Sequence, residues 1–222
     1  MIIFPDLKST SLNIKIFQFI LVLNILLLFA SCENREVVEK RNENGLLIER
    51  YTVNKSTKLK EGLHEIFSAN STALVQKSNY KDGVLDGDQT VYYETGQIQE
   101  RRHLDETGSL SGDFLSYFEN GKMKSEGHYS HGAMNGKWKF FYANGNVKQI
   151  LYYRDNVENG PFVEFHETGK MAAEGTFEND LEHGLLKIYD KDGTLTEQRD
   201  CDNGVCRTIW RSDLSKDGSK KL

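Results

Sequence analysis

The chain has 222 residues and a formal net charge of -5, with 38% hydrophobic residues, 19 glycines and only 2 prolines. This composition suits a thin, glycine-punctuated β structure better than an enzyme with a thick core. The negative charge removes the electrostatic attraction that supports non-specific binding to phosphate backbones, so we expect no nucleic-acid partner.

Residues 1–31 have the pattern of an export signal. Lys8 and Lys15 precede the apolar run "IFQFILVLNILLLFA", and "SCEN" follows it. The segment resembles a lipoprotein signal peptide, which makes Cys32 the acylated residue, although Phe29 stands where leucine is usual. The alternatives are a plain secretory signal or a membrane-spanning anchor, but the run is short for a span, which needs about twenty residues.

Lipidation at Cys32 predicts a membrane-anchored lipoprotein of the bacterial cell envelope. We favour the outer membrane over the inner membrane. Residues 32–40, which include the charged stretch "ENREVVEK", would then serve as a short tether between the anchor and the rest of the chain.

The rest of the chain repeats itself. Two series of glycines recur with steps of 24 or 25 residues: Gly87, Gly112, Gly136, Gly160 and Gly184, and Gly96, Gly121, Gly145, Gly169 and Gly193. Between them lie aromatic-rich segments such as "KWKFFYANG", which end in Asn-Gly, Thr-Gly or Asp-Gly. Such dipeptides supply the positive φ of a tight hairpin turn, so each repeat is predicted to be a β-hairpin.

Apolar residues occupy fixed columns of these hairpins and alternate with polar ones, as half-buried strands require. The columns predicted to point inward include Phe114, Trp138, Phe162 and Leu186 before the turns, and Tyr129, Tyr153, Phe177 and Cys201 after them. One hairpin cannot bury such a face alone. The predicted fold is therefore all-β: an elongated, twisted antiparallel sheet of stacked hairpins.

The repeat domain is predicted to cover residues 41–210, with about six hairpins of 24 to 25 residues. Residues 211–222 are polar and are expected to form a C-terminal tail. Cys201 and Cys206 bracket the stretch "DNGV". They are disulfide candidates because they could face each other across a hairpin in an oxidising compartment, and free thiols are the alternative.

The alternation of "YxxGxxxG" with "YxxNG", as in "YSHGAMNGKWKFFYANG" and "YKDGVLDGDQTVYYETG", resembles the MORN-repeat variant family. Within it, the chain is similar to the YwqK-like antitoxin-type proteins of bacteria. The resemblance implies a β-hairpin ribbon that binds other molecules. Two features depart from it: Asn156 and Asp180 replace the first loop glycine, and an export signal is unlike a cytoplasmic antitoxin.

No catalytic, cofactor-binding or metal site is predicted. His103 and His128 share a column, but equivalent strands of neighbouring repeats lie about 9.5 Å apart, too far to share a zinc ion. His166 stands where other repeats have an aromatic residue, which favours a packing role over a ligand role. A hydrolase or metal-dependent enzyme is the rejected alternative, because no repeat supplies clustered polar groups or a nucleophile motif.

The predicted function is that of a non-catalytic, lipid-anchored scaffold of the cell envelope that binds an unknown protein partner. The alternative is an antitoxin or immunity protein whose partner is a toxin. Outward aromatics could equally well serve to cover the second face of the sheet. As partner-binding candidates we select Tyr93, Phe118, Lys124, Tyr142 and Lys148 in the central repeats.

Overall fold

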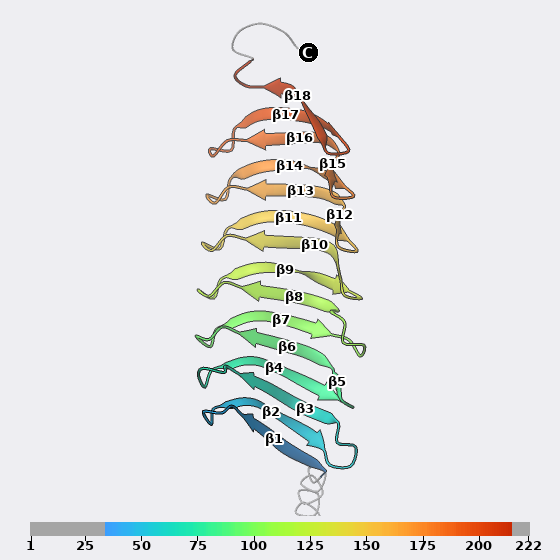
Figure 1. Cartoon of the computed structure of the whole chain (residues 1–222). Coiled ribbons are helices and arrows are strands. Elements are labelled where there is room, and N and C mark those ends of the chain that lie inside the picture. The colour runs from blue at the N-terminus through green and yellow to red at the C-terminus, as the bar shows by residue number, and fades with distance from the viewer. Residues whose placement is uncertain (1–33, 215–222) are drawn as a thin grey trace, which may run out of the picture.

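The computed structural model describes residues 34–214, so the predicted signal peptide, Cys32 and most of the predicted tail lie outside the described residues. The described part is an elongated ribbon of antiparallel strands without helices (Figure 1). This confirms the all-β fold of stacked hairpins. No helix within residues 34–214 is long and apolar enough to cross a membrane.

Within residues 34–214, eighteen strands form one sheet. They are β1 (Arg35–Arg41), β2 (Leu47–Asn54), β3 (Lys60–Phe67), β4 (Leu74–Lys81), β5 (Val84–Leu85), β6 (Gly87–Tyr92), β7 (Ile98–Leu104), β8 (Gly112–Tyr117), β9 (Met123–Ser130), β10 (Ala133–Phe141), β11 (Val147–Arg154), β12 (Val157–Glu158), β13 (Gly160–Phe165), β14 (Met171–Glu178), β15 (Leu181–Glu182), β16 (Gly184–Tyr189), β17 (Leu195–Asp202) and β18 (Val205–Arg211).

Each repeat is a hairpin whose second strand pairs with the first strand of the next repeat. Within residues 34–214 there are seven such hairpins, β1/β2, β3/β4, β6/β7, β8/β9, β10/β11, β13/β14 and β16/β17, and β18 adds a last strand. Residues 35–40, expected to belong to the tether, are part of β1. They form a strand because they pair in register with β2, from Arg35 opposite Asn54 to Lys40 opposite Glu49.

In the turns after β1, β6, β8, β10, β13 and β16, only the glycine of the Asn-Gly type dipeptide is in the left-handed region. In the turn after β10, the Gly145 amide donates to the Tyr142 carbonyl (2.8 Å) and the Tyr142 amide donates to the Asn146 carbonyl (2.8 Å). Gly145 has φ 95°, whereas Asn144 is not among the residues with positive φ. The turn thus ends in a glycine bulge, and the pairing register of β10 and β11 shifts next to it. Sequence reasoning had assigned positive φ to the whole dipeptide.

The opposite edge of the ribbon has two-residue loops in which both residues are left-handed. Asp155 and Asn156 have φ 51° and 69°, and Asn179 and Asp180 have φ 52° and 65°. Positive φ at both central residues is the geometry of the tightest hairpin loops, and Asn and Asp tolerate it better than other non-glycine residues. The substitutions at Asn156 and Asp180 therefore leave this turn intact.

One face of the sheet carries the core. Trp138 and Leu151 are each only 2% exposed and lie directly opposite each other on β10 and β11. Leu151 also belongs to a buried cluster with Phe162, Leu186 and Cys201. At the end of this cluster Cys201 and Cys206 are joined by a disulfide between paired positions of β17 and β18, with their Cα atoms 4.0 Å apart.

The buried face changes character along the ribbon. In the N-terminal half, the buried residues on this face are mostly polar: His64, Ser78, Gln89, Ser116 and Ser125. The buried apolar residues lie from Trp138 onward, apart from Val53. Ser116 and Ser125 satisfy each other through a hydroxyl–hydroxyl bond of 2.6 Å. The N-terminal half therefore depends more on polar contacts, and the C-terminal half on apolar packing.

Two strand glycines in extended conformation make room for aromatic rings. A Cβ added to Gly127 would lie 2.1 Å from Cδ2 of Trp138, and one added to Gly175 would lie 2.8 Å from Cε1 of Phe162. Glycine within a strand is normally destabilising because it has no side chain to pack. Here the ring of a neighbouring strand covers the bare backbone and replaces the missing side chain.

We predict that Gly127→Ala lowers the free energy of unfolding by about 3 kcal/mol, because its methyl group would overlap the buried indole of Trp138 and force the strands apart. Urea denaturation monitored by circular dichroism measures the loss. The control is His128→Ala, which changes the next residue on the exposed face and should cost under about 0.5 kcal/mol. Equal stability of Gly127→Ala and the wild type would contradict this packing.

Candidate binding surface

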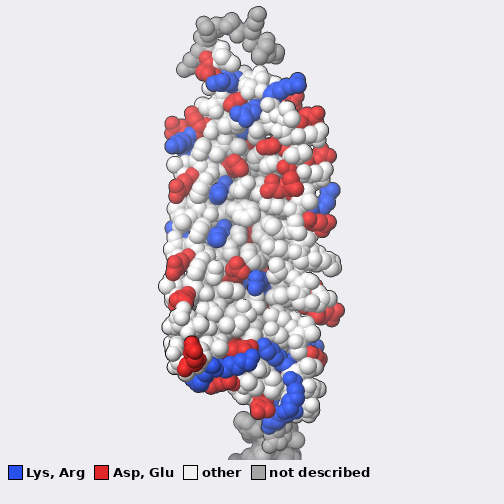
Figure 2. All heavy atoms as spheres, viewed as in Figure 1, with Lys and Arg blue, Asp and Glu red and all other residues white. Residues whose placement is uncertain are grey.

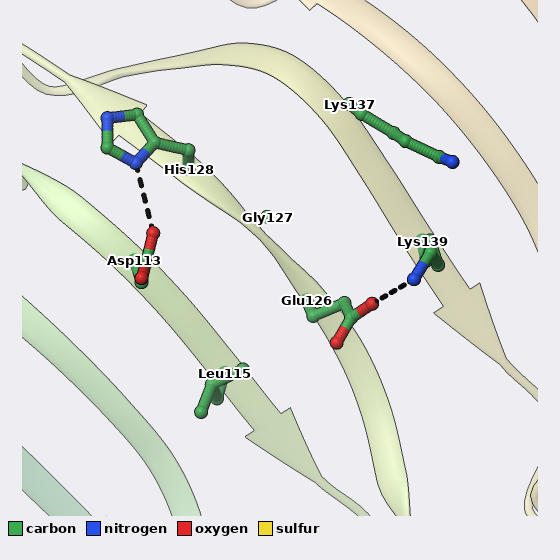
Figure 3. A pocket seen from close by; sticks show the side chains of 7 residues that line it. All are labelled: Asp113, Leu115, Glu126, Gly127, His128, Lys137 and Lys139. Atoms are coloured by element: carbon green, nitrogen blue, oxygen red, sulfur yellow. Dashed lines mark hydrogen bonds and ion pairs between the residues drawn. The ribbon is translucent and has the colours of Figure 1, made fainter.

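A shallow depression of about 340 Å³ lies over β8, β9 and β10 (Figure 3). It is lined by Asp113, Leu115, Glu126, Gly127, His128, Lys137 and Lys139. Lys137 and Lys139 flank Trp138 in sequence, and side chains alternate between the two faces of a strand. The depression is therefore on the face opposite the buried core, with the backbone of Gly127 in its floor.

A hydrogen bond and an ion pair cross the depression. The imidazole of His128 lies 3.2 Å from the Asp113 carboxylate, and the Lys139 ammonium group lies 2.5 Å from the Glu126 carboxylate (Figure 3). The partners come from neighbouring strands, so the pairs hold side chains in place across the sheet. Pairs as exposed as these contribute at most about 1 kcal/mol each to stability.

Three exposed lysines on the same face have no acidic partner among residues 34–214. Lys137 lines the depression, Lys124 precedes Glu126 by two residues on β9, and Lys148 precedes the half-buried Ile150 by two residues on β11. Along β9, β10 and β11 these lysines alternate with the core-facing residues Ser125, Trp138 and Leu151. Their side chains therefore lie on the face opposite the core. In a chain of net charge -5, they give the central repeats a local positive surface. On the face drawn in Figure 2, basic and acidic groups are intermixed along the ribbon.

The structure thus places the predicted Lys124 and Lys148 at an exposed face, but it gives the predicted aromatics a different role. The hydroxyl groups of Tyr93 and Tyr142 donate to the carbonyls of Tyr117 and Phe165, each at 2.8 Å. Both rings, and that of Phe118 in the same column, are half-buried. They were expected to be exposed anchors for a partner. Instead, the two tyrosines join one repeat to the next at the turn edge.

The same edge contains further links of this kind. The Nε2–H group of His166 donates to the Tyr189 carbonyl (3.1 Å), so His166 performs the task of the tyrosine hydroxyl in its column. The side-chain amides of Asn120 and Asn144 donate to the carbonyls of the next turns, at Ala143 and Glu167, each at 2.9 Å. The turn edge is therefore a ladder of side-chain links between repeats.

A second polar cluster lies on the core face near the N-terminal end. The Glu49 carboxylate lies 2.6 Å from Lys40, 3.0 Å from Lys60 and 2.8 Å from Nε2 of His64. Burial alone would raise the pKa of Glu49, but hydrogen bonds from these three cationic or polar groups outweigh it and lower the pKa to about 2. Glu49 is therefore ionised at neutral pH.

His64 in this cluster is neutral and closed off from solvent. Its ring is 4% exposed, and burial lowers its pKa, against the opposing effect of the hydrogen bond to Glu49. Its Nδ1 atom and the Oγ atom of Ser78, directly opposite on β4, have no hydrogen-bond partner. A substrate cannot reach a histidine buried to this extent, so we assign the cluster a structural role in joining β1, β2 and β3.

Sequence reasoning missed Lys137, Leu115 and Glu126 as parts of the depression. The signal was present, because these residues occupy the positions that alternate with the inward column of Phe114, Ser125 and Trp138. Along the described chain, no group of three or more His, Cys, Asp or Glu residues is arranged to hold a metal ion.

Four segments of the chain match the family described as MORN repeat variant, residues 85–106, 110–131, 134–155 and 158–179. They cover β6 to β14 and include the depression. MORN repeats often occur in proteins that bind membranes or other proteins, and the family is generally non-catalytic. No curated protein sequence matches the chain.

We predict that Tyr142→Phe lowers the free energy of unfolding by about 1 kcal/mol, because the Phe165 carbonyl loses its side-chain donor while the ring stays in place. Chemical denaturation provides the measurement. Tyr117→Phe is the matched control, since the Tyr117 hydroxyl makes no hydrogen bond within residues 34–214, and it should change stability by less than about 0.5 kcal/mol. If Tyr142→Phe had the same free energy of unfolding as the wild type, this link between repeats would contribute nothing to stability.

Proposed function

We propose that the protein is a non-catalytic, lipid-anchored scaffold of the bacterial cell envelope that binds a protein partner through the exposed face of β8 to β11. The observation that carries this proposal is the group of three exposed lysines, Lys124, Lys137 and Lys148, beside a depression on a rigid sheet. Their acidic neighbours in the depression, Asp113 and Glu126, are already engaged with His128 and Lys139.

The surface has the features of a protein-binding site. Leu115 and Ile150 supply apolar area between the charged groups, and both are half-buried in the absence of a partner. Repeats on both sides of the central strands hold the backbone, so little ordering entropy is lost on binding. Free lysines at the rim attract a partner of opposite charge and fix its orientation. The geometry therefore favours a protein with an acidic, partly apolar surface.

Anchoring at Cys32 would fix the position of the ribbon relative to the membrane. Only Glu33 and Asn34 separate Cys32 from β1, and residues span at most about 3.6 Å each. A lipid on Cys32 would hold the β1 end within about 10 Å of the membrane surface. This arrangement supports a scaffold that presents its central face to envelope proteins.

An immunity role is the second form of the same proposal, in which the acidic partner is a toxin. The resemblance to YwqK-like antitoxin-type proteins supports it. The export pattern of residues 1–31 restricts it, because a lipoprotein facing away from the cytoplasm meets only toxins that have themselves been exported. A neighbouring gene encoding a toxin with its own export signal would favour this form.

The lipid anchor is tested by metabolic labelling with an alkyne fatty acid. We expect the wild-type protein to be labelled and to fractionate with membranes, and Cys32→Ala to lose both properties, because no other residue has the acylation position. Cys201→Ser combined with Cys206→Ser controls for labelling at other cysteines and should be labelled like the wild type. Equal labelling of Cys32→Ala and the wild type would remove the anchor from the proposal.

The binding face is tested by charge reversal. We expect the combined substitutions Lys124→Glu, Lys137→Glu and Lys148→Glu to reduce the recovery of partners, after cross-linking in cells, by at least tenfold, which corresponds to about 1.4 kcal/mol. Thermal unfolding should be nearly unchanged, because all three side chains are exposed. Lys191→Glu, in the exposed turn of a later repeat, is the control. Partner recovery equal to that of the wild type would exclude this face as the site.

A further inference from the structure

One row of side chains on the face opposite the core alternates between aromatic rings and lysines. We call it the aromatic–lysine row, and its members are Tyr117 on β8, Lys124 on β9, Phe141 on β10, Lys148 on β11 and Phe165 on β13. Each lysine is the extra residue where the pairing register shifts, Lys124 beside Tyr117 and Lys148 beside Phe141. Extending the register of β9 with β10 by one residue places Lys124 beside Phe141 as well, and that of β11 with β13 places Lys148 beside Phe165.

The rings of the row point away from the core. Phe140 stacks on the buried Trp138 at 6.1 Å, so the alternation along β10 directs Phe141 to the opposite face. Tyr189, at the same position of a later repeat, has this direction too, because its hydroxyl donates to the Glu174 carboxylate on that face (2.8 Å). The three rings of the row are half-buried, and within residues 34–214 no second layer of structure covers them.

The polar groups of the row are available to a partner. Lys124 and Lys148 are exposed and have no acidic partner among residues 34–214. The hydroxyl group of Tyr117 makes no hydrogen bond within the same residues, whereas that of Tyr189 is engaged by Glu174. The row therefore offers two positive charges and one hydroxyl donor between apolar rings. A complementary ligand carries negative charge, free carbonyl groups and apolar side chains.

The spacing of the row indicates the conformation of this ligand. Equivalent members of the row are two strand steps apart, which is about 9.6 Å. A polyproline II segment repeats every three residues, about 9.3 Å, and its carbonyl groups are free to accept hydrogen bonds. An α-helix lying along the row would repeat every seven residues, about 10.5 Å. Side chains on one face of a β-strand recur about every 6.7 Å. From Tyr117 to Phe165, two such steps, the mismatch is about 0.6 Å for polyproline II and about 1.8 Å for the helix.

From these features, and resting on the proposed protein-binding function, we infer that the partner contributes an acidic polyproline II segment that lies along the aromatic–lysine row, one turn to each repeat. Its prolines would pack on the rings of Tyr117, Phe141 and Phe165, as in other aromatic-lined grooves that bind this conformation. One carboxylate in each turn would pair with Lys124 or Lys148. The segment therefore has an acidic residue at every third position, in the pattern Pro-Pro-Glu, and its preformed conformation limits the entropy lost on binding.

The test uses the full-length protein purified in detergent and labelled synthetic peptides. Fluorescence anisotropy at physiological ionic strength should show saturable binding of Ac-PPEPPEPPEPPE-NH2. Three control peptides should bind at least tenfold more weakly. Ac-PPKPPKPPKPPK-NH2 reverses the charge, Ac-EEPPPPPPPPEE-NH2 keeps the composition but loses the three-residue spacing, and Ac-GGEGGEGGEGGE-NH2 keeps the charges but lacks the prolines and the preformed conformation.

Variants of the protein locate the peptide on the row. Lys137 belongs to the lysine face, the exposed lysines Lys124, Lys137 and Lys148, but it lies outside the row. It precedes Phe141 by four residues, about 13 Å along β10, which exceeds the screening length of about 8 Å at physiological salt. Lys124→Glu combined with Lys148→Glu should therefore weaken binding of the Pro-Pro-Glu peptide at least tenfold, and Lys137→Glu less than threefold. Phe141→Leu should weaken it at least fivefold with unchanged circular dichroism, whereas Tyr152→Leu, on the same face outside the row, should bind like the wild type.

The outcomes separate this inference from the proposed function. Absence of saturable binding, equal binding of the two acidic proline peptides, or equal effects of Lys137→Glu and the double lysine variant would overturn the inference. Partner recovery in cells is measured independently of the peptides. If the triple lysine variant loses its partners there but the wild type binds no Pro-Pro-Glu peptide, the binding face stands and its ligand is not polyproline II. Unchanged recovery in the triple variant would exclude the face itself.

Discussion

A single-layered sheet can cover its apolar face only with side chains from its own neighbouring strands, and this constraint governs the structure of the ribbon. Trp138 illustrates it. Its indole contacts Phe114 and Tyr129 of the preceding repeat and Phe140 and Tyr153 of its own, at ring distances of 5.1 to 6.3 Å. No hairpin in such an arrangement is stable alone, so each repeat gains its stability from the interfaces with the next. Chain ends, which have one neighbour only, need other means of stabilisation.

The ends meet this need in two different ways. At the N-terminal end, Glu49 joins Lys40 of β1, Lys60 and His64 of β3, and the ammonium group of Lys60 lies 4.6 and 4.9 Å from the ring centres of Tyr51 and Tyr80. At the C-terminal end, a disulfide closes the last hairpin. The polar cluster protects its edge strand with charge, whereas the disulfide stabilises a hairpin and leaves its outer edge apolar. The asymmetry of the edges follows from these two solutions.

The repeat phase, the hairpins and most of the inward columns could be predicted from the sequence, because glycine spacing and two-residue alternation are local signals. The packing between repeats could not. Nothing within one repeat reveals that Gly127 lies beneath Trp138, or that the hydroxyl of Tyr142 reaches Phe165, 23 residues further along. An aromatic residue that recurs at the same position of each repeat could serve either exposure for binding or burial for packing, and only the position of the next repeat decides. The exposed position of Lys137, by contrast, follows from a local signal, its alternation with Trp138 along the strand.

These structural roles leave few parts of the ribbon free for recognition. The core face is filled by mainly polar buried residues in the N-terminal half and by apolar ones from Trp138 onward. The turn edge is occupied by tyrosine, histidine and asparagine links between repeats. The opposite face of the central repeats remains. Fourteen steps between neighbouring strands separate β1 from β18, which is about 67 Å at 4.8 Å per step. With the proposed anchor at the β1 end, the lysine face would lie midway along this length and the β18 edge farthest from the lipid. A partner bound to the lysine face would therefore lie alongside the ribbon, midway between the membrane surface and β18.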